Sequence, residues 1–178
     1  MEKEKFLWCV WGSIGIIIMG ILFLIFPLLT ITNLDLVFKL FLGIFTLVSL
    51  LEFLFQYQNK EYSSFLIFLA SIIILILSFI FNITEMPKTL ALTLIAWLLF
   101  TSFSKIKKAD YFHDKKSKVW CLEISLLVLL FVAGLLTSVN FAFSSETSIL
   151  LLGYFTFLYG VIELQENLLI YLTKGKIK

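Results

Sequence analysis

The stretch Phe6–Phe26 contains no charged side chain. As an α-helix it would extend about 30 Å, which is the thickness of the hydrocarbon core of a bilayer. Comparable apolar stretches follow, and over the whole chain 61% of the residues are hydrophobic and 15% are charged. Soluble domains average about 45–50% apolar and 25% charged residues. One core in a chain of 178 residues cannot hide this excess, so we expect an all-α, polytopic membrane protein.

The chain divides into six apolar stretches, and each is predicted to be one transmembrane helix. Lipid leaves a single segment no other way than a helix to satisfy its backbone hydrogen bonds. Pro27 suits the end of the first helix better than its interior. Because the connections are short, residues 1–178 are predicted to form one membrane domain without a separate soluble part. The predicted spans are approximately 6–26, 36–55, 64–81, 88–104, 119–141 and 149–172.

The lysines are distributed unevenly between the two sides of these spans. All 14 basic residues are lysine, and of these only Lys39 and Lys88 fall on one side. Cytoplasmic segments of membrane proteins are enriched in basic residues. We therefore expect both termini and the Lys105–Lys118 segment, interpreted as a loop, to be cytoplasmic, with the protein in the cell (inner) membrane.

The spans form three two-helix hairpins, approximately 6–57, 62–105 and 119–172. The first and third hairpins are the most alike, because Leu42–Thr46 and Leu152–Thr156 are identical at all but one position. Trp11 and Trp120 open the corresponding first helices, whereas the middle hairpin has no glycine. Such a pattern indicates that one packing unit is reused in parallel orientation.

Together these features resemble the HdeD family of short-repeat membrane proteins. The residues that carry the resemblance are Trp11, Gly12, Gly15, Gly20, Pro27, Gly43, Trp120, Gly134, Gly153 and Gly160. The resemblance implies a bacterial or archaeal inner-membrane protein with six spans and no accepted catalytic residues. Because a named member of that family is linked to acid resistance, it also implies a non-enzymatic role in acid or stress response.

Small residues mark candidate helix-packing positions. On the last helix Gly153, Thr156, Gly160 and Glu163 fall within about 80° of one another at 100° per residue. Small side chains let membrane helices approach closely. Packing inside one bundle is one interpretation, and a homo-oligomer seam or a substrate path is the other. The candidate packing residues are Gly12, Gly15, Gly20, Gly43, Gly153, Thr156 and Gly160.

Four carboxylates in the predicted spans, Glu52, Glu123, Glu163 and Glu166, are candidate proton-responsive groups. A charged residue at mid-span costs roughly 2.5–3.5 kcal/mol on insertion scales. The glutamates must therefore either reach interfacial water or face the bundle, where they would be paired or protonated. Because burial disfavours the charged form of a carboxyl group, an inward Glu163 would serve as a proton sensor or relay.

Other chemistries find little support. Asp110, His113 and Asp114 are surrounded by lysines that would repel a metal ion, so neither a metal site nor a cofactor is expected. One histidine, no arginine and no catalytic motif argue against an enzyme, and the small net charge suggests no nucleic-acid partner. A small-solute transporter, or a substrate-binding membrane subunit of an uptake system, is the alternative function. The polar residues that could line its pocket are few, namely Ser71, Ser78, Thr93, Ser125 and Thr137.

Overall fold

A computed structural model describes residues 2–29, 33–56, 62–80, 87–114, 119–143 and 148–174, and in these residues it is all-helical. The prediction of an all-α fold is thus confirmed. A short 3₁₀ helix that contains Pro27, η1 (Phe26–Leu29), follows the first helix. The α-helices are α1 (Glu2–Ile25), α2 (Leu34–Gln56), α3 (Tyr62–Ile80), α4 (Pro87–Asp114), α5 (Val119–Phe143) and α6 (Ser148–Lys174).

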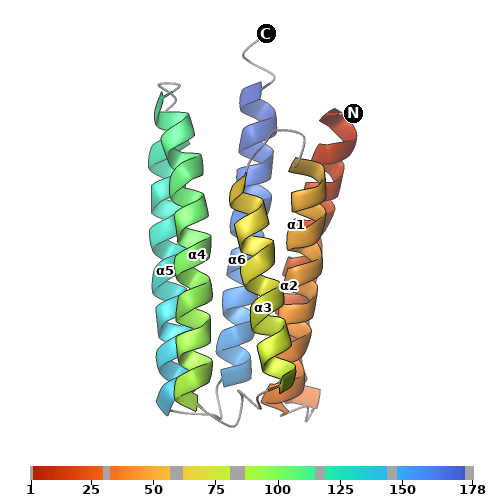
Figure 1. Ribbon diagram of the computed structural model, residues 1–178, viewed down its shortest axis with the longest axis vertical. Helices are drawn as coiled ribbons and strands as arrows, with labels where there is room; N and C mark the ends of the chain where they lie inside the picture. The colour runs from red at the N-terminus through yellow and green to blue at the C-terminus, as the bar shows by residue number, and fades with distance from the viewer. Residues whose placement is uncertain are drawn as a thin grey trace.

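The six helices run up and down in one bundle (Figure 1). The first turn of α1 and the last turn of α6 lie at the same end of it, as an even number of antiparallel helices requires. The hairpins α2–α3 and α4–α5 pack as sequence neighbours, whereas α1 packs most extensively against α6. Helix α6 also contacts α5 and α2, so it occupies the centre of the bundle.

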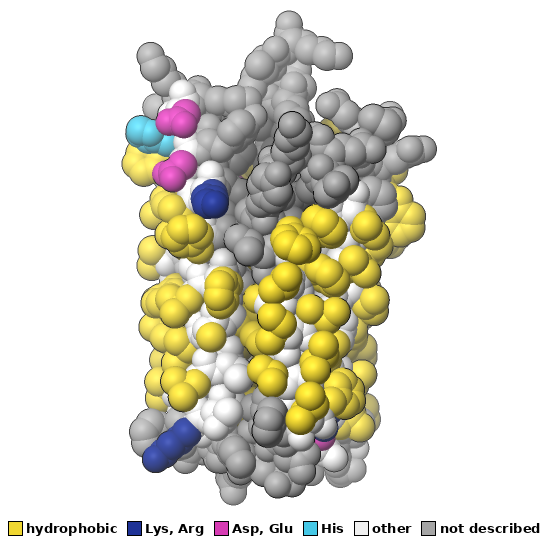
Figure 2. Space-filling view, in the orientation of Figure 1, with side chains coloured by type: hydrophobic (Ala, Val, Ile, Leu, Met, Phe, Trp, Pro, Cys, Tyr) yellow, Lys and Arg dark blue, Asp and Glu magenta, His cyan; other side chains and the backbone are white. Residues whose placement is uncertain are grey.

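Among the described residues, four helices are long and apolar enough to cross a membrane, over Phe6–Leu29, Lys88–Lys107, Val119–Phe141 and Ser148–Leu169. On α4 the segment Lys88–Lys107 has 20 residues, which corresponds to about 30 Å of helix. Figure 2 shows one face of the molecule, where hydrophobic side chains cover the middle and charged side chains lie toward the two ends. This distribution fits a protein surrounded by lipid.

Trp97 of α4 organises the centre of the core. Its ring lies edge-on to Phe45 of α2, 4.7 Å between centroids, and to Phe155 of α6, 5.7 Å between centroids. Phe45 and Phe155 belong to the two matching segments of the sequence. In both segments the threonine, Thr46 or Thr156, donates a hydrogen bond to the carbonyl of the segment's leucine at 2.7 Å. The two segments therefore share a local environment on either side of one indole.

Glycine allows α1 and α6 to approach each other closely. A Cβ atom on Gly20 would lie 2.5 Å from Cα of Phe157, and one on Gly153 would lie 2.9 Å from the backbone nitrogen of Leu24. At Gly160 the corresponding atom would lie 2.8 Å from the backbone nitrogen of Ile17. Real Cβ atoms do not approach backbone so closely, so these glycines are required by packing within the chain.

The other small residues have different surroundings. A Cβ atom on Gly12 would lie 3.2 Å from the Val48 side chain of α2. At Gly15 and Gly43 an added Cβ would meet nothing within 4 Å, so the close approach expected there is absent from the described structure. Gly134 packs against the Leu98 side chain, which would lie 2.7 Å from its Cβ.

Charged residues lie at the start of α2 and at the end of α4. At the start of α2 the Asp35 carboxylate and the Lys39 ammonium form an ion pair, 2.7 Å apart. The fourth helix, in contrast, does not end at Ser104, because α4 continues to Asp114. Residues 105–114 are therefore helical rather than a loop. The reason is that Lys105 and Ala109, each 3% exposed, face the bundle and extend the buried side of the helix by one more turn.

Candidate functional site

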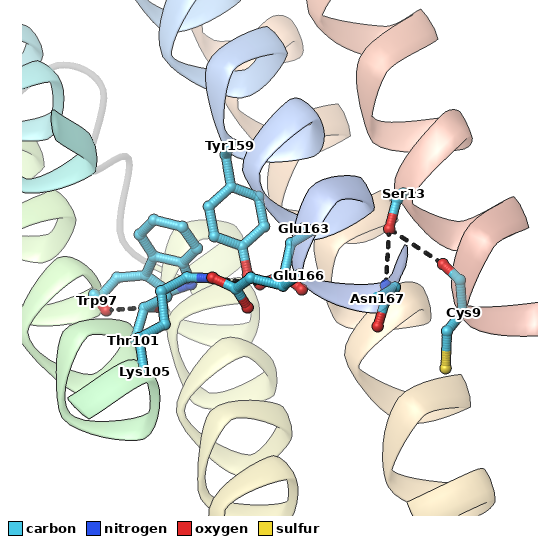
Figure 3. A network of polar contacts seen from close by, with 9 residues as sticks. All are labelled: Cys9, Ser13, Trp97, Thr101, Lys105, Tyr159, Glu163, Glu166 and Asn167. Atoms are coloured by element: carbon cyan, nitrogen blue, oxygen red, sulfur yellow. Dashed lines mark hydrogen bonds and ion pairs between the residues drawn. The ribbon is translucent and has the colours of Figure 1, made fainter. Parts of the chain in front are cut away.

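A buried cluster of charged side chains joins α4 to α6. The Lys105 ammonium donates to Oε1 of Glu163 at 2.8 Å and also to Oε1 of Glu166. The three residues are 3%, 5% and 1% exposed, respectively. The expectation left open two orientations for Glu163 and Glu166, and the structure places both carboxylates inside the bundle and pairs them with a lysine. Figure 3 shows the cluster in the space between the two helices.

Aromatic and hydroxyl groups surround this cluster. The Tyr159 hydroxyl donates to the same Glu163 oxygen at 2.9 Å, and the Lys105 nitrogen lies 5.5 Å from the Tyr159 ring centroid. Trp97 lies beside the Tyr159 ring, 5.5 Å between centroids. On α4 the residues Trp97, Thr101 and Lys105 follow at intervals of four and so lie along one side of the helix. The Thr101 hydroxyl donates to the Trp97 carbonyl at 3.0 Å.

A second polar contact lies on the α1 side of α6. The Asn167 side-chain amide donates to the Ser13 hydroxyl at 3.1 Å, and that hydroxyl donates to the Cys9 carbonyl at 3.0 Å (Figure 3). Gly153, Gly160 and Asn167 recur every seven residues and face α1. Glu163, expected on the same stripe, instead faces α4 with Tyr159 and Glu166. This side of α6 therefore contacts two neighbouring helices, α1 by close packing and α4 through charged side chains.

The cluster contains more acid than base. With both carboxylates ionised and Lys105 protonated, the three groups carry a net charge of −1. A buried net charge is strongly unfavourable, because desolvation of an ion costs several kcal/mol unless it is compensated. Uptake of one proton by Glu163 brings these three groups to neutrality. The arrangement can thus accept a proton at a carboxylate that shares its ammonium with a second acid.

The remaining carboxylates have separate positions. Glu123 of α5 is buried, with 2% of its surface exposed. Glu52 lies on α2, but its side chain is outside the described residues. Asp110 and His113 are exposed on the last turns of α4, and the His113 ring packs edge-on to Trp120 at 5.3 Å between centroids. Within the described ranges no three His, Cys, Asp or Glu side chains are grouped so that they could hold a metal ion.

The polar residues that could line a transporter pocket bond within their own helices. The Ser71 and Thr137 hydroxyls each donate to the carbonyl four residues earlier, at 2.8 and 2.9 Å. Ser78 and Thr93 donate to the carbonyl three residues earlier, both at 2.7 Å, and Ser125 donates four residues back at 2.9 Å. Their hydroxyl protons are therefore used locally and do not converge on a shared site.

Comparison with known proteins identifies no relative of this chain. No family model matches the chain, and no curated protein and no solved structure matches it either. The buried cluster is therefore the main guide to function.

Lys105, Trp97 and Tyr159 are the members of the site that the sequence did not single out. Two signals were present in the sequence. Tyr159 and Glu163 are four residues apart on one helix, and Trp97, Thr101 and Lys105 repeat the same interval on another. Lys105 was grouped with the lysines that follow it, because nothing in the local sequence distinguishes the buried Lys105 from the exposed Lys107.

Proposed function

We propose that this chain is a proton-responsive, non-enzymatic membrane protein of the HdeD type, which spans the inner membrane six times with both ends in the cytoplasm. The observation that carries the proposal is the sharing of one buried ammonium by two buried carboxylates. Acidification adds a proton to this cluster, weakens the attachment of Lys105 to α6, and so changes how α4 is held against the rest of the bundle.

Three exposed tryptophans support the proposed membrane placement. Trp8 and Trp11 near the start of α1, and Trp120 near the start of α5, are 51%, 64% and 38% exposed. Their helices start at the same end of the bundle (Figure 1), and tryptophan is enriched at membrane–water interfaces. Lys105 lies two residues before the end of the Lys88–Lys107 segment, so the cluster would lie about 3 Å inside the boundary on this side.

Trp97 offers a direct reporter of the cluster. Phenylalanine at Trp8, Trp11 and Trp120 leaves the buried Trp97 as the single indole in the protein. We expect its emission to change between pH 8 and pH 4.5 in detergent or lipid nanodiscs, because the charges beside the ring change. The change should vanish in Glu163→Gln/Glu166→Gln and persist in the matched control Asp35→Asn, whose carboxylate belongs to an ion pair elsewhere.

Two results would contradict the proposal at the molecular level: a Trp97 signal that does not depend on pH, or one that survives unchanged in the double glutamine variant.

The stress-response part has its own test, which is survival of the source cells in acid with and without the gene. Complementation by the wild type but not by the double glutamine variant is expected. Equal survival of all strains over several acidic pH values would overturn this part.

A further inference from the structure

The exposed side of α4 changes in character toward the end of the helix. Phe103, Lys107, Asp110 and Asp114 are all exposed. They lie within about 60° of one another at 100° per residue, so they form one stripe along the helix. Lys105 lies on the other, buried side. Figure 2 shows this order over α4, with a basic side chain at the edge of the hydrophobic surface and acidic side chains beyond it.

This exposed stripe crosses the boundary of the membrane. Lys107 ends the 20-residue apolar segment that begins at Lys88. Because a helix rises about 1.5 Å per residue, Asp110 lies about 4.5 Å farther out than Lys107, and Asp114 lies about 10.5 Å farther out. The headgroup layer on each side of a bilayer is about 5–8 Å thick. Lys107 and Asp110 therefore lie within this layer, whereas Asp114 lies beyond it.

The charges on the exposed stripe have the order that complements a zwitterionic phospholipid. In such a lipid the phosphate lies next to the acyl part and the amine lies farther out, nearer to water. On α4 the Lys107 ammonium comes first and the Asp110 carboxylate follows. The Lys107 nitrogen lies 5.5 Å from the Phe103 ring centroid, so the ammonium is held at the edge of the apolar surface, at the level of lipid phosphates.

We propose that the exposed stripe of α4 binds one phospholipid that carries a primary ammonium, of the phosphatidylethanolamine class. The lipid phosphate accepts a hydrogen bond from Lys107, and the lipid ammonium donates to Asp110. An acyl chain lies along Phe103 and Leu99, which are 63% and 54% exposed. The inference depends on the crossing of the membrane by α4 and does not depend on the proton response proposed above.

Two other common phospholipids fit the exposed stripe less well. Phosphatidylglycerol offers a phosphate to Lys107 but no cation to Asp110. Phosphatidylcholine has a cation, but its quaternary ammonium has no N–H to donate. A general attraction of anionic lipids to basic segments would give a different order of affinity, with phosphatidylglycerol first. Headgroup selectivity therefore separates a specific site from this general attraction.

The test measures lipid affinity by native mass spectrometry of the full chain, with ethanolamine, choline and glycerol phospholipids that have the same acyl chains. We expect the ethanolamine lipid to bind about two- to fivefold more tightly than the other two, the range that one exposed ion pair supplies. Asp110→Asn should remove this preference. Lys107→Gln should weaken the binding of all three lipids, because each presents a phosphate.

Two matched controls accompany these variants. Asp114→Asn makes the same change of charge outside the headgroup layer, and Lys88→Gln removes an exposed lysine at the opposite end of the apolar segment. Both should retain the preference for the ethanolamine lipid. Equal effects of Asp110→Asn and Asp114→Asn would refute the proposal, because depth in the headgroup layer would then be irrelevant.

The lipids alone also decide the question. Equal affinity of the wild type for the three lipids, or tighter binding of the glycerol lipid, refutes the site without any substitution. The Trp97 response to pH is measured separately in the same variants. It should persist in Lys107→Gln and Asp110→Asn, so a failure of the lipid site is distinguishable from a failure of the proton response.

Discussion

Replacing Gly20 by alanine should weaken the bundle strongly, because this glycine lies where α1 and α6 are closest. The added Cβ would lie 2.5 Å from Cα of Phe157, whereas carbon atoms in contact are about 3.5–4.0 Å apart. The two backbones must therefore separate by about 1 Å. Overpacking typically costs about 1–3 kcal/mol, and we expect the upper end of this range because backbone atoms cannot swing aside as a side chain can.

Gly15→Ala is the matched control on the same helix. Its Cβ would meet nothing within 4 Å, so only the preference of helices for alanine acts, which stabilises by about 0.5–1 kcal/mol. The free energies of unfolding of the two variants should differ by about 3–4 kcal/mol. Unfolding by sodium dodecyl sulfate in mixed micelles, followed by circular dichroism, measures this difference. Equal stability of the two variants would refute the close approach of α1 and α6 at Gly20.

Three further substitutions test the polar contacts. Lys105→Met at neutral pH should lower the free energy of unfolding by about 3–5 kcal/mol, because it removes the Lys105 ammonium from two buried carboxylates. Adding Glu163→Gln and Glu166→Gln to this variant should recover most of the loss in the same unfolding assay. A double-mutant cycle between Ser13→Ala and Asn167→Ala should give a coupling of about 0.6 kcal/mol, typical of side-chain hydrogen bonds in membrane proteins, and zero coupling would argue against this contact. Lys39→Met should change the unfolding midpoint little, because the Asp35–Lys39 pair is partly exposed and stabilises the fold by less than about 1 kcal/mol. A destabilisation as large as that of Lys105→Met would contradict the distinction between the exposed and the buried ion pair.

The helical fold could be predicted because lipid restricts a single apolar segment to one backbone structure. Hydrophobic length located α1, α5 and α6 to within a few residues. It failed at the end of α4, where Lys105 begins a charged segment that nevertheless continues as helix. Hydropathy treats every lysine alike, whereas the position of Lys105 depends on two glutamates 58 and 61 residues away along the chain.

The candidate site could be predicted in part for the same reason. Glu163 and Glu166 stand out in the sequence because carboxylates are costly within apolar helices. Which way they face depends on rotation of α6 against α4, and this rotation is set by tertiary packing. Gly153 and Gly160 contact α1, which fixes the rotation and turns the glutamates toward α4. A sequence shows the small residues and the charged residues, but it does not show which neighbour each set meets.

The pairing of α1 with α6 has a consequence for biosynthesis. Helix α1 enters the bilayer first, yet its main partner is made only after four other helices have been synthesised. Until then Gly20 has no α6 backbone beside it, and α1 must persist as a span without its main partner, which its uncharged segment Phe6–Phe26 permits. Docking of α6 then completes the bundle and, in the same movement, brings both glutamates to Lys105. A ribosome stalled before Ser148 should therefore leave a chain that is inserted but not assembled.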